Sequence, residues 1–275
     1  MSLNEILLIC AALLPAITLC VYIYIKDRAE KEPIGLLLGL LGLGCVICLP
    51  AALLETLFMY AIDFVFAPLG WNGLVERLYI AVECIFDVAL VEEGLKFLVL
   101  FLVTSKNKNF NSLFDGIIYA VFVSLGFAAL ENVLYVLENG WINAIMRAIM
   151  SVPGHMFFAV MMGYYYSLWH MCELARAQEQ RMKWAGLIPA DAKEFSGKGY
   201  LVKSLVVPIL IHGLYDYCCS VGTLLATLGL IAVVVAMYIV CFRRIRLMSR
   251  YDTDDISYTA AMIRKKYPHL GTEVR

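Results

Sequence analysis

The chain has 275 residues, of which 62% are hydrophobic and only 16% are charged, and its mean hydropathy is +0.78. Soluble globular domains are close to half apolar and about a quarter charged, so this composition excludes an ordinary soluble protein. The net charge of −1 carries no information about partners, and we expect no nucleic-acid partner.

Seven apolar runs are each long enough to cross a bilayer, which takes roughly 20 residues of helix. Because nothing outside them could build a separate soluble core, we predict an all-α fold, a polytopic membrane helix bundle of about seven transmembrane helices. The bundle would occupy residues 1–242, with a cytoplasmic insert at 171–200 and a cytoplasmic tail at 243–275. The seven runs are Leu3–Ile25, Ile34–Ile62, Leu78–Val103, Leu113–Leu137, Ala144–His170, Leu201–Ser220 and Val221–Phe242.

Lysine and arginine predict the orientation of the bundle, because short cytoplasmic loops are enriched in them. In a seven-helix zigzag, 19 of the 22 Lys and Arg residues fall on one side. The exceptions are Lys96, inside a run, and Arg77 and Arg147, at the opposite ends of their runs. We therefore expect the N-terminus outside, the C-terminus in the cytoplasm, and a multi-pass protein surrounded by membrane lipid.

The cytoplasmic segments carry weaker signals of structure. Glu173–Trp184 continues the fifth run as a polar helix, and Gly186–Pro189 predicts a turn. A short helix in the tail would begin at Asp254 or Asp255, since aspartate caps helix N-termini well.

Ionisable residues inside an apolar run indicate function, because a charge in lipid costs several kcal/mol unless it is paired or hydrated. The run Leu78–Val103 holds four carboxylates and a lysine. Glu92 and Lys96 are four residues apart, and Glu93 and Lys96 three, so these side chains can meet on one helix face. A lysine beside two glutamates keeps one of them ionised, which provides a general base. The alternative is an ion pair that only joins helices.

Three further runs carry polar groups at matching depths. Glu131 and Asn132 lie in the fourth run, His155 in the fifth, and His212 and Asp216, four apart on one face, in the sixth. A lone membrane histidine more often bonds two helices than binds a ligand. However, a rise of ~1.5 Å per residue places all these groups between the midplane and the outer leaflet, which predicts a shared cavity.

Glutamates, histidines and water in a protected cavity suit hydrolysis. This reaction needs a base for the water, donors for the oxyanion and an acid for the leaving group. A zinc site is an alternative, with His155, His212 and Glu131 as ligands and Glu92 or Glu93 as the base. The H-E-x-x-H helix of many zinc proteases is absent from the sequence. On these residues alone, a proton-coupled carrier also stays open.

Four short motifs, each on a different run, resemble those of the PrsW family of intramembrane proteases. Residues 91–96 (VEEGLK) are similar to its E-E-x-x-K motif, and residues 127–132 (FAALEN) to its F-x-x-x-E-N motif. Residues 153–155 (PGH) and 212–216 (HGLYD) resemble the third and fourth motifs. The turn at 27–33 (DRAEKEP) is similar to the acidic E-P turn of that family.

This resemblance implies a polytopic protease that makes the first, outer-side cut in a membrane-bound anti-sigma factor, a single-pass membrane protein. The family is distantly similar to the CAAX prenyl protease and Abi group. That group has an arginine, a histidine and an asparagine where this chain has Lys96, Glu131 and Asp216. The runner-up is a non-enzymatic membrane protein, either a proton-coupled transporter or a scaffold. Transporters often contain inverted repeats, and we find no repeat in this sequence.

Eight residues form the predicted site. The catalytic members are Glu92, Glu93, Glu131, His155, His212 and Asp216, and the supporting members are Lys96 and Asn132. One of the paired glutamates is the base, and Glu131 is its partner around the water. The two histidines are oxyanion donors or metal ligands, and Asp216 orients His212. The favoured mechanism requires no cofactor, and zinc is the alternative.

Overall fold

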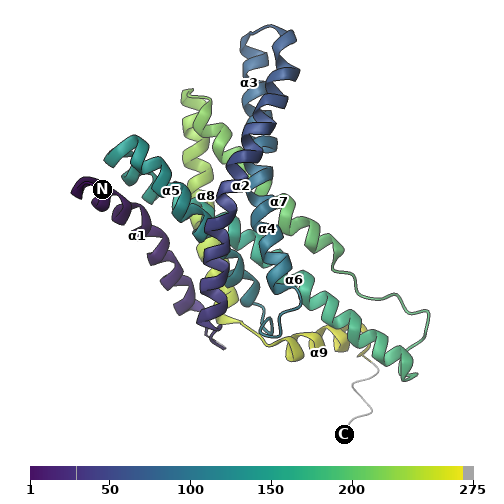
Figure 1. The fold of residues 1–275 in the computed structure, drawn as a ribbon. Coiled ribbons are helices and arrows are strands. Elements are labelled where there is room, and N and C mark those ends of the chain that lie inside the picture. The colour runs from purple at the N-terminus through teal and green to yellow at the C-terminus, as the bar shows by residue number, and fades with distance from the viewer. Residues whose placement is uncertain (29, 269–275) are drawn as a thin grey trace.

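A computed structural model describes residues 1–28 and 30–268 of the chain, which form a bundle of long helices (Figure 1). The expected all-helical architecture is confirmed for this part of the chain, which adds one isolated β-bridge between Ser112 and Asp254. The elements are α1 (Leu3–Lys26), α2 (Ile34–Phe66), η1 (Ala67–Leu69), α3 (Gly73–Val82), η2 (Glu83–Ala89), α4 (Leu90–Thr104), α5 (Asp115–Ile149), α6 (Ser151–Trp184), α7 (Lys198–Ser220), α8 (Leu224–Arg250) and α9 (Asp255–Lys266).

Within the described residues, five helical stretches are long and apolar enough to cross a membrane. They are Leu3–Lys26, Ile34–Leu69, Asp115–Trp184, Lys198–Ser220 and Leu224–Arg250. The third stretch joins α5 to α6, and it is not straight, because the chain turns at Gly140, where φ is 74°. Only glycine adopts this backbone conformation without strain. The run made of α3, η2 and α4 is outside this set, and it carries seven charged side chains: Glu76, Arg77, Glu83, Asp87, Glu92, Glu93 and Lys96.

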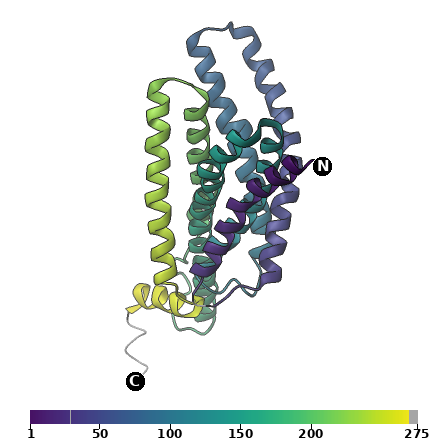
Figure 2. The ribbon, with the colours of Figure 1, turned by 90° about the vertical axis from the view of Figure 1, so that its left-hand side faces the viewer.

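The connections alternate between the two ends of the bundle (Figures 1 and 2). The turns from α1 to α2, from α4 to α5 and from α6 to α7 lie toward the end that also carries α9. The turns from α2 to α3 and from α7 to α8 lie at the other end, as does the N-terminus. The end that carries α9 therefore gathers the segments that hold most of the Lys and Arg residues.

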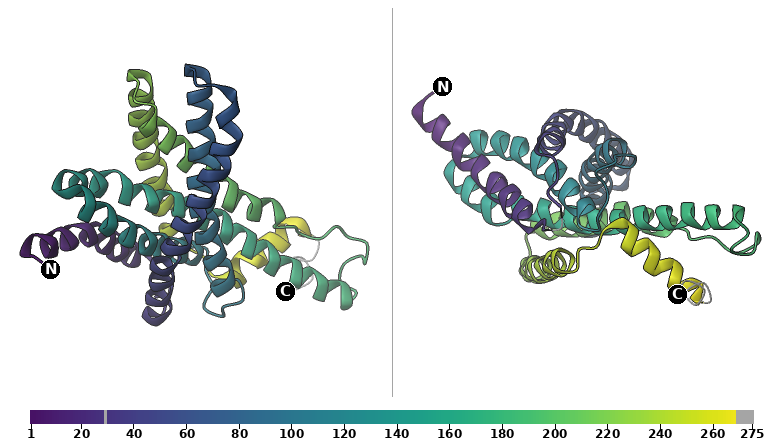
Figure 3. Two further views of the ribbon diagram at one scale, coloured as in Figure 1. Left: turned by 45° about the horizontal axis from the view of Figure 1, so that its top comes forward. Right: turned by 90° about the horizontal axis from the view of Figure 1, so that it is seen from below.

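Helices α5 and α6 form the centre of the bundle. Every side chain from Gly116 to Ala128 of α5 is buried, and so is every side chain from Val152 to Val160 of α6. Helix α5 also contacts α1 and α2, and α6 contacts α7, α8 and α9. Seen from below (Figure 3, right), α2 to α4 and α8 lie on opposite sides of α6. Ser124 and His155, the polar side chains of these two segments that lie at the site, are consequently enclosed by other helices.

The polar extension of α6 packs against α9 and the segment before α7. The fully buried carboxylate of Glu179 accepts hydrogen bonds from the backbone N–H of Phe195 (2.6 Å) and the hydroxyl of Tyr267 (2.9 Å), and it also pairs with Lys266. Helix α6 ends at Trp184, and α9 begins at Asp255 with Asp254 as its N-cap. Both predictions for these segments are therefore confirmed.

The acidic turn between α1 and α2 is anchored to the start of α5. Glu32 is buried and accepts a hydrogen bond of 2.5 Å from the hydroxyl of Tyr119, and Asp27 accepts one of 3.2 Å from the backbone N–H of Glu32. Burial raises the pKa of Glu32 to about 8 and that of Asp27 to about 6. The turn is thus packed into the fold, and burial shifts both carboxylates toward the protonated form.

Candidate active site

The paired glutamates lie at the start of α4, directly after the π-helical segment η2. The ammonium of Lys96 donates hydrogen bonds of 2.8 Å to Oε2 of Glu92 and to Oε1 of Glu93. All three side chains are buried, with Glu93 fully enclosed. The contacts predicted from the three- and four-residue spacings are present. A charged cluster inside the bundle is stable only because its members neutralise one another.

His155 of α6 connects this cluster to α5. Its Nδ1 lies 3.2 Å from Nζ of Lys96, and its Nε2 lies 2.9 Å from Oε2 of Glu131. Ser124 lies seven residues before Glu131 in α5. Its hydroxyl donates a hydrogen bond of 2.9 Å to the backbone carbonyl of His155. The imidazole is therefore fixed between a cation and a carboxylate that come from two different helices.

His212 of α7 reaches the cluster from the opposite side. Its Nδ1 lies 3.1 Å from Oε1 of Glu93, and its Nε2 lies 3.2 Å from Oδ2 of Asp216. Gly213 allows this approach, because a Cβ atom there would lie 2.8 Å from Cγ1 and 3.1 Å from Cα of Ile85 in η2. Such contacts are shorter than van der Waals packing permits, so any side chain at this position would separate α7 from η2.

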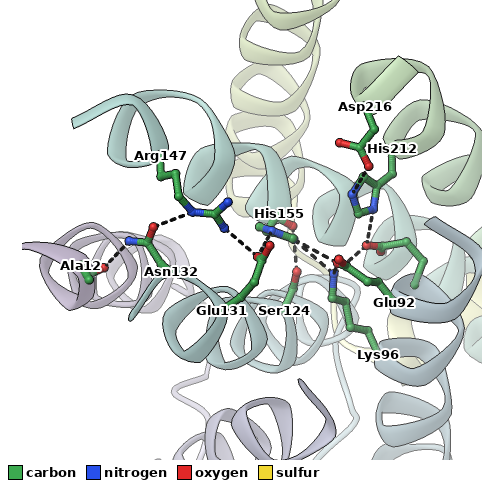
Figure 4. Close-up of polar contacts among 11 residues, drawn as sticks. Ala12, Glu92, Lys96, Ser124, Glu131, Asn132, Arg147, His155, His212 and Asp216 are labelled. Carbon is green, nitrogen blue, oxygen red and sulfur yellow. Dashed lines mark hydrogen bonds and ion pairs between the residues drawn. The ribbon is translucent and has the colours of Figure 1, made fainter. Parts of the chain in front are cut away.

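A cavity of about 690 Å³ joins these groups. The predicted site residues that line it are Glu92, Glu131, His155, His212 and Asp216. Glu93 and Lys96 lie behind the wall, in contact with Glu92 and both histidines. Figure 4 shows the whole set converging from α4, α5, α6 and α7. The predicted shared cavity is therefore present, with Glu92 and not Glu93 on its surface.

The structure adds two residues that the sequence interpretation missed. Arg147, on the limb of α5 that follows Gly140, places Nη2 2.9 Å from Oε2 of Glu131 and donates from Nε to Oδ1 of Asn132 (2.8 Å). Glu55 of α2 lines the cavity. The sequence shows each as a charged residue in an apolar run, but it does not show that the side chain points toward the site.

Three side chains of the site bring their donor atoms close enough together for a metal site. Among the described residues, Glu92, Glu93 and His155 form the group whose donor atoms all lie within 4.8 Å of one another. The residue types suit zinc, and Oε2 of Glu93 is buried without a hydrogen-bond partner. However, Nζ of Lys96 lies within 3.2 Å of all three side chains and fills the position between them. As arranged, the group fits an ammonium and does not fit a metal ion.

Carboxylates and imidazoles around a cavity of this size, inside an apolar helical bundle, are typical of a polytopic membrane hydrolase. Comparison with known proteins identifies the family of this hydrolase. A family model described as "PrsW family intramembrane metalloprotease" matches residues 32–242. The chain belongs to the PrsW family and is a multi-pass membrane protease. This membership favours the protease over the transporter and scaffold alternatives.

Curated relatives match over most of their length. The protein named Protease PrsW from Oceanobacillus iheyensis is 31% identical over 236 residues, which cover 86% of this chain and 93% of the relative. The protein of the same name from Geobacillus kaustophilus is 32% identical over 210 residues, which cover 76% of this chain and 78% of the relative. Protease PrsW from Bacillus subtilis is 31% identical over 210 residues, which cover 76% of this chain and 81% of the relative. No solved structure matches the chain.

Proposed function

We propose that this protease hydrolyses a peptide bond of a single-pass membrane protein, an anti-sigma factor, near the outer face of the membrane. The observation that carries the proposal is the cavity, because it brings the carboxylates of Glu92, Glu131 and Asp216 and the imidazoles of His155 and His212 from four helices to one shared volume. Peptide hydrolysis inside a membrane needs such a volume, since water and the cleaved bond must meet away from lipid.

Glu92 is the general base in this proposal. It lines the cavity, whereas Glu93 lies behind the wall between Lys96 and His212. The Lys96 ammonium donates a hydrogen bond of 2.8 Å to Oε2 of Glu92 and holds this carboxylate in place, and Glu92 removes the proton from the water. Glu93 is then a positioning residue, since its carboxylate fixes both the lysine and the second histidine.

Glu131 and His155 complete the proton path. Glu131 is the partner of Glu92 around the water, and His155 connects Glu131 to Lys96 through its two ring nitrogens. A proton taken from the water can pass through this chain to the leaving amine. Asp216 orients His212 through their 3.2 Å contact.

Neither histidine has a ring nitrogen left for the oxyanion. Both nitrogens of His155 lie within 3.2 Å of Lys96 or Glu131, and both nitrogens of His212 within 3.2 Å of Glu93 or Asp216. This geometry argues against the two imidazoles as oxyanion donors. The proposed catalysis also requires no metal, because Lys96 supplies the positive charge at the paired glutamates.

The orientation in the membrane is part of the proposal. We infer seven membrane crossings, with the run of α3, η2 and α4 as the third and the turn at Gly140 separating the fourth from the fifth. The N-terminus is outside, and the Lys- and Arg-rich end that carries α9 is cytoplasmic. Residues 1–242 form the protease domain, with a cytoplasmic insert at 171–200 and a cytoplasmic tail at 243–275.

A reconstituted cleavage assay tests this function. Detergent-purified protein is incubated with a single-pass reporter that carries the transmembrane segment and outer flank of an anti-sigma factor, with and without chelator. We expect cleavage in both conditions and none with Glu92→Gln. Loss of activity in chelator that zinc restores would overturn the metal-free mechanism but not the protease assignment. Failure to cleave any anti-sigma reporter would overturn the substrate class.

A further inference from the structure

Addition of water to a peptide carbonyl produces an oxyanion, and an enclosed site must provide donors for it. The Lys96 ammonium already contacts Glu92, Glu93 and His155. Together with the engaged nitrogens of both histidines, this leaves the predicted site residues without a cationic donor directed into the cavity. The donor must therefore come from another part of the cavity wall.

Arg147 is held at that wall from two sides. Its Nε donates to Oδ1 of Asn132 (2.8 Å), and Asn132 in turn donates from Nδ2 to the backbone carbonyl of Ala12 (2.7 Å) in α1. The guanidinium carbon lies 4.2 Å from the ring centre of Tyr135. Figure 4 shows this series from α1 through Asn132 and Arg147 to Glu131. The guanidinium is consequently fixed in position before any substrate binds.

Arg147 also has donor capacity that the resting site does not use. Its Nη2 lies 2.9 Å from Oε2 of Glu131, but this buried nitrogen makes no hydrogen bond of acceptable direction. Of the described residues that line the cavity, Arg147 is the one with a permanent positive charge, beside the carboxylates of Glu55, Glu83, Glu92, Glu131 and Asp216. An unmet donor beside Glu131, the proposed partner of the base, is unfavourable in the resting enzyme and useful when a negative oxygen forms.

We propose that Arg147 is a catalytic residue that donates hydrogen bonds to the oxyanion of the scissile carbonyl, an inference that rests on the proposed function. The water oxygen forms a bond to the carbonyl carbon, and its proton moves to Glu92. The π electrons of the carbonyl move to its oxygen, which Arg147 stabilises. When these electrons return, the carbon–nitrogen bond breaks, and the nitrogen takes the proton that Glu92 removed from the water and leaves as an amine.

Neutral hydroxyls are the rival donors. Tyr215 and Ser151 line the same cavity. A hydroxyl lacks the positive charge that makes a charge-assisted hydrogen bond about twice as strong as a neutral one. The guanidinium also presents its N–H groups in a fixed planar fork. The test therefore includes a hydroxyl variant as its matched control.

The experiment compares Arg147→Gln, Arg147→Lys and Tyr215→Phe with wild type. Each is assayed on a peptide that spans the mapped cut, and on the same peptide with a phosphinate in place of the scissile amide. The phosphinate is a tetrahedral anion, so its affinity reports stabilisation of the oxyanion, while KM for the parent peptide reports ground-state binding. Thermal melting in detergent checks the fold.

Removal of one oxyanion donor lowers kcat by about 100- to 1,000-fold. We expect Arg147→Gln to lose this much kcat, to lose phosphinate affinity in parallel and to keep KM and melting temperature. Arg147→Lys should recover part of both losses, and Tyr215→Phe should be close to wild type. Lower kcat with unchanged phosphinate affinity would reduce Arg147 to a structural partner of Glu131. An equal loss in Tyr215→Phe would move the role to the hydroxyl. If wild type cleaves no reporter, the proposed function fails instead.

Discussion

Nδ1 of His212 lies 3.1 Å from Oε1 of Glu93, although 119 residues separate them in the chain. The same oxygen accepts a hydrogen bond of 2.8 Å from Lys96. The carboxylate of Glu93 thus connects Lys96 of α4 to His212 of α7. Its side chain does not line the cavity. Glu92, its neighbour in sequence, faces the cavity. The two glutamates therefore have different tasks.

This difference predicts two distinct phenotypes. Glu92→Gln should lower cleavage by at least ~100-fold, as expected for loss of a general base, with little change in melting temperature. Glu93→Gln should also nearly abolish cleavage, but it should lower the melting temperature as well, since it leaves the buried Lys96 ammonium under-compensated. Cleavage rates and thermal melting of both purified variants provide the measurement. Near-normal activity in both variants would refute the site.

Gly213 provides a steric test of the contact between α7 and η2. We expect Gly213→Ala to lower kcat by roughly 10- to 100-fold, because a displacement of about 1 Å can cost that much. Ile85→Ala in the same chain removes the nearest clashing atom, Cγ1, and should restore part of the activity. Gly199→Ala, also in α7, is the control, since its Cβ would meet nothing within 4 Å. Equal effects at Gly199 and Gly213 would contradict this account.

Regular helix geometry explains why much of the site could be predicted from the sequence. Spacings of three and four residues fix which side chains share a helix face, so the Glu92–Lys96 and His212–Asp216 contacts follow from the sequence. Depth counting, at a constant rise per residue, correctly brought Glu131 and His155 to one level. These are local rules, and they hold wherever a helix is regular.

The remaining features depend on irregular backbone. Seven residues of η2 are π-helical, which changes the rotation per residue, and the sequence interpretation treated this run as one regular helix. It also treated Arg147 as a charge at the outer end of a helix. The turn at Gly140 returns that residue to Asn132 and Glu131. Neither the π-helix nor the course of this turn has a recognisable pattern in one sequence.

The buried acidic turn predicts a dependence of stability on pH. The pKa of Glu32 is raised to about 8 by burial, so the folded state favours the protonated form. Its contribution to stability is full below about pH 4.5 and is lost as the pH rises through 8. Glu32→Gln, which is always neutral, should melt higher than wild type at pH 9 and respond less to pH between 5 and 9.

The control for this prediction is Glu138→Gln, which changes an exposed carboxylate two residues before the turn at Gly140. Its melting curve should follow wild type at every pH. A pH response in Glu32→Gln as steep as that of wild type would show that another group determines it.

The orientation proposed from the Lys and Arg residues can be tested directly in intact cells. A tag at Ser2 should be accessible to protease from outside, and a tag after Arg275 should be protected until the membrane is permeabilised. The reason is that positively charged segments are retained in the cytoplasm. The reverse pattern of accessibility would overturn the orientation and, with it, the predicted side of cleavage.

The position of the cut tests the central claim most directly. Purified protein is incubated with a single-pass anti-sigma reporter, and mass spectrometry identifies both product ends for wild type and for Glu92→Gln. A juxtamembrane segment is easier to unwind than the middle of a helix, whose peptide bonds are shielded by hydrogen bonds. We predict that wild type cuts just outside the span or in its outer third, and that Glu92→Gln yields no product. A cut on the cytoplasmic side, or equal cleavage by Glu92→Gln, would contradict the account.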